Sequence, residues 1–303
     1  MNNIYVYEGI VSLFIIMIIG IYARKKDIIT DEINKGLTDI LLKISLPLLI
    51  ISSFNITYSD ELKLNVMKSF YYSIITFVIS VIVSKILLKL IKSNNKYILQ
   101  FSNVFSNCGF VGFPIIEGIY GKEGLIYASV FNMIFTIFVW TYGVSLFTGG
   151  ISKENIKKVI SNPSIIAVCI GMLIMIFKIN LPSIILNPIE TVGSITSALS
   201  MLIVGAIIAN INIKDYIKDL SLYYGVVIKL LIIPILIYFV LLLLPGPLKV
   251  IKVMVLLSAM PTAAMAPIFA ESFEKDRRYA SVLLFLTTLF SVISFPIMIV
   301  IIK

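Results

Sequence analysis

Two short stretches of the sequence combine polar side chains with residues that interrupt helices. The first contains Asn103, Asn107, Gly109, Gly112 and Pro114. Proline removes a backbone donor and clashes with the preceding turn, and glycine weakens a helix, so this stretch predicts a broken helix with unpaired backbone groups. Asn103 and Asn107 are spaced four residues apart, and in a continuous helix they share one face. An amide donor beside free backbone N–H groups is suited to binding a carboxylate.

The second stretch contains Pro261, Thr262 and Pro267 in a run of small residues. If the two broken segments cross, the amino-terminal ends of their half-helices meet, and those ends carry partial positive charge and free N–H groups. We therefore expect the two segments to form one binding site for an anion. The same residues also fit a plainer alternative, because Gly and Pro often mark only kinks or close packing in membrane helices.

Three ionisable residues are candidates for exchanging a proton or binding a cation. Lys229 lies deep in an apolar run, where a charge is costly and marks a functional site by default. Glu117 follows Pro114 by three residues and Glu271 follows Pro267 by four, so both flank the expected crossing. The alternatives are a snorkelling or ion-paired lysine, and carboxylates that merely end their helices at the membrane surface.

Polar residues in the next apolar run, Asn132 and Thr136, are further candidates for contact with a ligand. Membrane Asn and Thr side chains more often bond neighbouring helices, and that alternative stays open. The two cysteines, Cys108 and Cys169, lie in apolar runs far apart in sequence, so we expect no disulfide.

The elements that must position these residues are long apolar runs. Hydrophobic residues make up 59% and charged residues 14% of the 303 residues, and the mean hydropathy is +1.04, which excludes a soluble protein. A helix needs about 20 apolar residues to cross the hydrocarbon core. We predict an all-α membrane protein with ten membrane-spanning helices near 6–23, 37–54, 66–88, 97–118, 123–147, 163–179, 192–212, 220–243, 250–270 and 278–302.

Lys and Arg are concentrated in the loops that follow the odd-numbered predicted helices. The positive-inside rule places those loops in the cytoplasm and both termini outside the cell. The first residues carry no basic side chain and no small-residue cleavage site follows the first run, so we expect a retained helix and no signal peptide. The net charge of +9 lies in short clusters between apolar runs. This distribution predicts a multi-pass protein of the cell membrane that contacts the lipid bilayer and no nucleic acid.

The two halves of the chain repeat a set of features in the same order. Pro114 is followed by a charged turn and then by Tyr-Ala-Ser-Val at 127–130, and Pro267 is followed by a charged turn and the same four residues at 279–282. Residues 1–150 and 151–303 are therefore predicted to be two five-helix repeats. An odd number of helices per repeat inverts the second copy in the membrane. Inverted repeats with broken helices are typical of secondary transporters, which bind substrate near the midplane.

One motif resembles a known family. The residues at 107–114, Asn-Cys-Gly-Phe-Val-Gly-Phe-Pro, resemble the auxin efflux carrier family, which includes the plant PIN carriers and many bacterial members. Asn107, Gly112 and Pro114 match the family pattern, and the stretch from Pro261 to Pro267 resembles its second half. The resemblance covers essentially the whole chain.

The resemblance implies a fold shared with bile-acid symporters and sodium/proton antiporters, in which broken helices 4 and 9 cross. Helices 1, 2, 6 and 7 would form a scaffold and the contact of a homodimer, and helices 3–5 and 8–10 would form a moving transport domain. Such a protein would carry a small organic anion by an elevator-type alternating-access mechanism, with a proton or Na⁺ as the coupling ion. By this likeness Asn107 would contact the substrate carboxylate, with Pro114 and Pro261 shaping the crossing.

Two departures from the plant members bear on the substrate. Glu117 stands where plant members would carry a basic residue, and only the short segment 149–162 joins the two halves. We therefore expect malate- or malonate-like anions at least as much as auxin-like ones.

An enzyme is the main alternative class, and the composition argues against it. Histidine is absent, which excludes an HExxH zinc site and a Ser-His dyad. The sequence has no Gly-rich Lys-Ser/Thr loop for ATP. We therefore expect no enzyme activity, no cofactor and no metal ion. A passive channel and a ligand-binding membrane receptor remain alternatives to a carrier.

Overall fold

The computed structural model describes residues 3–56, 59–150, 153–209, 211, 216 and 218–302, and side chains in the first helix are described from residue 11 onward. Across these residues the regular secondary structure is helical, apart from one isolated β-bridge between Ser106 and Thr262. The prediction of an all-α protein is confirmed.

The helices begin and end where capping residues, glycines and prolines punctuate the apolar runs. Ser59, Asn162 and Asp276 accept N–H groups of the first turns of α4, α9 and α15, as capping requires. The first half contains α1 (Asn3–Lys25), α2 (Asp31–Ile40), η1 (Leu41–Ser45), α3 (Leu46–Ser53), α4 (Asp60–Leu87), η2 (Leu88–Leu90), α5 (Lys96–Val104), η3 (Cys108–Gly112), α6 (Phe113–Phe138), η4 (Val139–Gly143) and α7 (Val144–Thr148). The second half contains α8 (Lys153–Ile160), α9 (Pro163–Ile176), α10 (Ser183–Ala209), α11 (Leu220–Val227), η5 (Ile228–Ile232), α12 (Ile233–Leu242), α13 (Leu248–Ser258), α14 (Ala266–Ser272) and α15 (Arg277–Ile301).

Six described helical stretches are long and apolar enough to cross a membrane, and the pair α8 and α9, bent by 47°, would make a seventh. The number is below the ten predicted runs for three reasons. The side chains of α1 are described only in part, and the runs at α5 and at α13 with α14 are interrupted. The stretch 108–148 joins two predicted runs, and Gly121, with a φ of 62°, kinks it between them.

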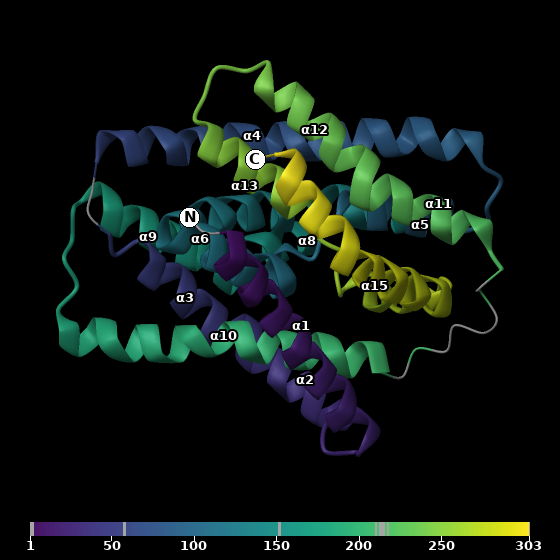
Figure 1. Cartoon of the computed structure of the whole chain (residues 1–303), viewed down its shortest axis with the longest axis horizontal. Helices are drawn as coiled ribbons and strands as arrows, with labels where there is room; N and C mark the ends of the chain where they lie inside the picture. Colours follow the sequence, from purple (N-terminus) through teal and green to yellow (C-terminus); the bar gives the residue numbers. More distant parts are fainter. Residues whose placement is uncertain are drawn as a thin grey trace.

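Four helices, α1, α3, α9 and α10, pack on one another through glycines, and we call them the glycine-packed helices. A side chain at Gly20 would clash with the main chain of Leu202 on α10, and one at Gly205 would clash with the Met17 carbonyl on α1. Small residues at these positions let the two helix backbones touch, which is a common way for membrane helices to associate. In Figure 1, α10 runs along one edge of the molecule.

A second group contains α4, α5, α6 and α11–α15, and we call it the crossing helices. Its helix α4 runs along the edge opposite α10, with α6 and α15 drawn between the two (Figure 1). Aromatic packing stabilises the centre of this group. The ring centroid of Phe105 lies 4.7 Å from that of Phe101 and 5.6 Å from that of Phe135, and Phe77 stacks on Phe138 at 5.1 Å. Phe105 is the residue before the β-bridge, so this packing positions the bridge.

Candidate functional site

The two interrupted segments cross at a short antiparallel bridge. The N–H of Asn107 donates to the Pro261 carbonyl at 2.7 Å, and the N–H of Ala263 donates to the Phe105 carbonyl at 2.9 Å. The breaks lie at 105–107, between α5 and η3, and at 259–265, between α13 and α14. Non-helical backbone at membrane depth needs such internal partners, and here each broken segment supplies one to the other.

Asn107 begins the helical stretch that runs from η3 into α6. Its Oδ1 accepts from the Phe110 N–H at 3.2 Å, and its carbonyl accepts from the Gly112 N–H at 3.0 Å. The side chain is buried, and its Nδ2 has no partner among the described residues. One side-chain donor is therefore free at the amino-terminal end of a long helical stretch, a place that favours anions.

Asn132 of α6 lies beside the first residues of η3. Cys108 Sγ donates to Asn132 Oδ1 at 3.5 Å, and a Cβ built on Gly109 would lie 3.9 Å from the same oxygen. The structure thus brings one of the predicted ligand residues of α6 next to the amino-terminal end of η3. The other, Thr136, uses its hydroxyl within α6, where it donates to the Asn132 carbonyl at 2.8 Å.

Gly112 and Pro114 shape the first segment. A Cβ at Gly112 would lie 2.8 Å from Leu257 Cδ2, so the missing side chain lets η3 approach α13. Pro114 lies in the first turn of α6, directly after the wide π-type turn of η3. The segments η1 and η5 precede Pro47 and Pro234 in the same way. A widened turn relieves the clash between a proline ring and the carbonyl four residues earlier.

The second segment is built differently. Thr262 is buried, and its N–H donates to Thr287 Oγ1 at 3.2 Å while its Oγ1 donates to the Ser102 carbonyl at 3.4 Å. Pro267 lies in the first turn of α14, which has 7 residues and no side-chain cap. The Ala264 N–H has no acceptor among the described residues. The two amino-terminal ends at the crossing are therefore unequal, because only the first opens a long helix.

Lys229 of η5 lies against the carboxyl-terminal ends of α5 and α13. Its Nζ donates to Ser106 Oγ at 2.7 Å and to the carbonyls of Asn103 and Ser258, each at 3.3 Å. The side chain is 1% exposed, and it forms no ion pair with the residues that the structure describes. Neither a snorkelling lysine nor an ion pair describes this arrangement. The ammonium instead faces the partial negative charge of two helix ends.

Asn103 does not share a helix face with Asn107, and this prediction is wrong. Because α5 ends at Val104, the four-residue spacing spans a break in the helix. The Nδ2 of Asn103 donates to Ser84 Oγ on α4 at 3.0 Å. Its Oδ1 is buried and has no partner in the described part of the chain.

The two predicted coupling carboxylates are engaged away from the β-bridge. Ser197 Oγ on α10 donates to Glu117 Oε2 at 3.4 Å. Glu271 pairs with Arg277 at 2.7 Å, and its side chain is 58% exposed. Glu271 therefore matches the alternative of a carboxylate at a helix end.

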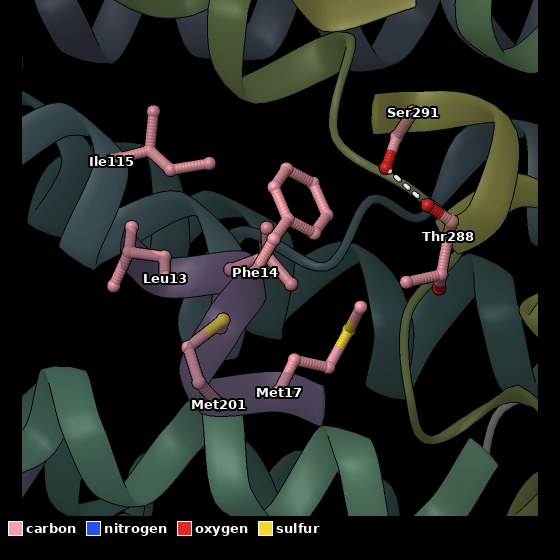
Figure 2. A pocket seen from close by; sticks show the side chains of 8 residues that line it. Leu13, Phe14, Met17, Ile115, Met201, Thr288 and Ser291 are labelled. Carbon is pink, nitrogen blue, oxygen red and sulfur yellow. Dashed lines mark hydrogen bonds between the residues drawn. The ribbon is translucent and has the colours of Figure 1, made fainter. Parts of the chain in front are cut away.

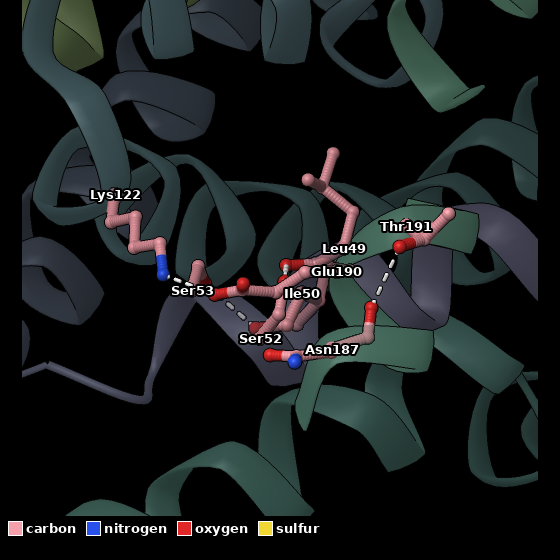
Figure 3. A network of polar contacts seen from close by, with 8 residues as sticks. All are labelled: Leu49, Ile50, Ser52, Ser53, Lys122, Asn187, Glu190 and Thr191. Atoms are coloured by element: carbon pink, nitrogen blue, oxygen red, sulfur yellow. Dashed lines mark hydrogen bonds and ion pairs between the residues drawn. The ribbon is translucent and has the colours of Figure 1, made fainter. Parts of the chain in front are cut away.

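A second polar link joins α6 to the glycine-packed helices. Lys122 follows the kink in α6 and forms an ion pair with Glu190 of α10. Figure 3 shows this pair close to Ser53, at the end of α3. Together with the Glu117 hydrogen bond, it connects α6 to α10 at two points.

A small pocket lies between the glycine-packed helices and the crossing helices (Figure 2). Its lining comes from α1, η3, α6, α10 and α15, namely Leu13, Phe14, Met17, Val111, Ile115, Met201, Thr288 and Ser291. Its open interior is about 10 Å³, room for roughly one water molecule. The sequence reasoning missed these residues, and Thr288 and Ser291, three apart in an apolar run, were the available polar signal.

Comparison with known proteins identifies relatives along the whole chain. A family model described as membrane transport protein matches residues 5–299. An uncharacterized transporter of Methanocaldococcus jannaschii is 24% identical over 301 residues, which cover 94% of this chain and 95% of the relative. An uncharacterized transporter of Methanothermobacter thermautotrophicus is 23% identical over 300 residues, which cover 96% of each chain.

Proposed function

The chain belongs to the membrane transport protein family, to which the auxin efflux carriers belong, and we propose that it carries a small organic anion across the cell membrane. The family match and the named relatives support a multi-pass membrane transporter. The proposed substrates are carboxylates of the malate or malonate kind, or auxin-like acids. The observation that carries this proposal is the free donor Asn107 Nδ2 at the start of η3.

Charge at the crossing favours an anion over a neutral or cationic substrate. A buried donor without a partner costs free energy, and a hydrogen bond to a charged group contributes about 1.5–3 kcal/mol. The amino-terminal end of the 108–148 stretch adds partial positive charge. Lys229 lies at the crossing, and none of the carboxylates that the structure describes forms an ion pair with it. A bound carboxylate would accept from the free Asn107 Nδ2.

The packing supports two inverted five-helix repeats, residues 1–150 and 151–303. Gly20 in the first predicted run packs on the seventh, at Leu202, and Gly171 in the sixth packs on the second, at Phe54. If each predicted run is replaced by its counterpart in the other half, the contact between the first and seventh runs becomes the contact between the sixth and second runs. The contacts of α5 with α11 and of α4 with α13 are related in the same way. Such pairing is what a two-fold relation between the halves requires.

Polar contacts between loops sort into two sets, which supports ten spans with both termini outside. One set joins loops predicted to lie outside: Lys68 and Tyr72 to the Pro245 carbonyl, Lys249 to Glu123, and Lys122 to Glu190. The other joins loops predicted to be cytoplasmic: Asn95 and Tyr216 to Asp276, and Tyr224 to the Leu87 carbonyl. Each contact joins segments on the same predicted face.

The proposed mechanism is an elevator in which the crossing helices move against the glycine-packed helices. Backbone contact through Gly20 and Gly205 suits a rigid scaffold, on which a homodimer contact would also lie. The links to α10 from Glu117 and Lys122 would have to break in each cycle. The closed pocket between the groups then corresponds to a state that excludes substrate.

Reconstituted protein tests this proposal directly. In proteoliposomes loaded with one carboxylate, we expect saturable counterflow of labelled malate, malonate or indole-3-acetate. Linear, non-saturating flux would identify a channel, and binding without flux would identify a receptor.

Asn107→Ala should reduce counterflow to the background of empty liposomes, because it removes the free amide donor and the cap of η3. Asn187→Ala is the matched control, since Asn187 is an exposed asparagine of α10 and its loss should leave flux unchanged. Wild-type counterflow by purified Asn107→Ala protein would remove Asn107 from the substrate site.

A further inference from the structure

Three oxygen atoms at the crossing surround a single ammonium group. The carbonyls of Asn103 and Ser258 come from the last turns of α5 and α13, and the Ser106 hydroxyl comes from the first break. All three residues and Lys229 are at most 2% exposed. The cluster therefore joins both interrupted segments to η5 inside the bundle.

This set of oxygens is the kind that binds a hard cation. Carbonyl oxygens at the carboxyl-terminal ends of broken helices coordinate Na⁺ or accept protons in secondary transporters, and carbonyl and hydroxyl oxygens are preferred ligands of such ions. A lysine ammonium offers three N–H donors and one unit of charge. Three donors and three acceptors match, so nothing in the cluster requires a dissolved ion.

We propose that the ammonium of Lys229 permanently occupies the cation position of this crossing, so that the carrier needs no Na⁺ to bind or move its anion. The inference rests on the proposed anion transport for its second half, but the occupancy of the position is a property of the protein alone. Lys229 enters from η5 and contacts both interrupted segments, so one residue both holds the crossing together and supplies its charge.

The contacts of the other coupling candidates agree with this assignment. Glu117 is bonded to Ser197 and Glu271 to Arg277, and neither contacts the three oxygens. If the ammonium is removed, the position offers the same three oxygen atoms to an incoming ion.

Thermal unfolding of the purified full-length protein in detergent tests the occupancy without any substrate. Melting temperatures are compared in NaCl, KCl and choline chloride at equal ionic strength, for wild type and for the variants Lys229→Ala, Lys229→Met and Lys43→Ala. Lys229→Ala opens the position, whereas Lys229→Met keeps the chain length and fills it without charge. Lys43 lies in η1 with a side chain that is 64% exposed, so Lys43→Ala controls for the loss of a lysine elsewhere.

We expect Na⁺ to raise the melting temperature of Lys229→Ala by several degrees over choline, because an ion that binds only the folded state stabilises it. Wild type, Lys229→Met and Lys43→Ala should melt at the same temperature in all three salts. The proposal would be overturned if Na⁺ does not change the melting temperature of folded Lys229→Ala protein, or if Na⁺ raises the melting temperature of the wild type. If Lys229→Ala yields no folded protein, the wild-type comparison alone decides in the same way.

A flux measurement separates this inference from the proposed function. Wild-type counterflow should keep its rate when Na⁺ is replaced by K⁺ on both sides, and a rate that falls at least tenfold would overturn the inference while leaving anion transport intact. Absence of flux for every carboxylate would contradict the proposed function, and the melting experiment would still decide whether Lys229 fills the cation position.

Discussion

The two interrupted segments, one in each half of the chain, are built differently. In the first, α5 stops at Val104 and a helix resumes at Cys108 under a cap from Asn107. In the second, the break spans 259–265 and α14 ends after 7 residues without a side-chain cap. The second break contains Pro261 and the first contains no proline, and the bridge between Ser106 and Thr262 joins them.

This difference indicates that the two segments have different roles at the crossing. The first segment offers an unpaired amide donor, Asn107 Nδ2, at the start of a long helix, so it can bind an anion. In the second segment, the N–H and the hydroxyl of Thr262 both have hydrogen-bond acceptors, and the neighbouring residues are small. This segment therefore packs against the first segment and positions it.

Asn107→Asp should show the largest effect, because it separates the two tasks of the side chain. A carboxylate oxygen can still accept from the Phe110 N–H and cap η3, so the melting temperature should stay near wild type. The free donor is lost and a negative charge faces the anion. Counterflow should fall about 100-fold, as expected for about 3 kcal/mol.

The matching change in the second segment is Thr262→Asp, and stability is the readout that distinguishes the two. The Thr262 side chain has no free donor to lose and is fully buried, so a carboxylate there should lower the melting temperature strongly. Equal melting temperatures of Asn107→Asp and Thr262→Asp would contradict the different roles assigned to the two segments.

Gly109→Ala should show an intermediate effect on transport. The structure leaves space for a Cβ at Gly109, with Asn132 Oδ1 at 3.9 Å, so the fold should tolerate the methyl group. The added methyl group is only two residues from Asn107, whose amide is the free donor. It should therefore raise the counterflow KM about fivefold, which corresponds to about 1 kcal/mol. Michaelis curves of purified variants measure this.

Gly112→Ala serves as the comparison, because its Cβ would lie 2.8 Å from Leu257 Cδ2 and should act first on stability. A Gly109→Ala protein with wild-type KM would place the anion elsewhere along the crossing.

The sequence was sufficient to predict the crossing itself but not its details. Prolines and glycines in two polar stretches indicated the interruptions, but the first break lies at 105–107, before Gly109, Gly112 and Pro114, which are helical in η3 and α6. The face shared by Asn103 and Asn107 was wrong, because spacing arguments assume a continuous helix and α5 ends one residue after Asn103. The partners of Lys229 depend on how η5 packs on segments far away in sequence, which no local pattern encodes.

Thr262→Val should show the smallest effect on transport and tests the passive role of the second segment. Valine keeps the shape of threonine and the main-chain bond from residue 262 to Thr287, and it removes only the 3.4 Å bond to the Ser102 carbonyl. We expect a loss of about 1 kcal/mol in unfolding free energy and an unchanged counterflow KM. Melting curves and Michaelis curves on the same preparation measure both quantities. A large rise in KM at wild-type stability would show that the Thr262 hydroxyl reaches the anion, and the crossing would then bind through both of its halves.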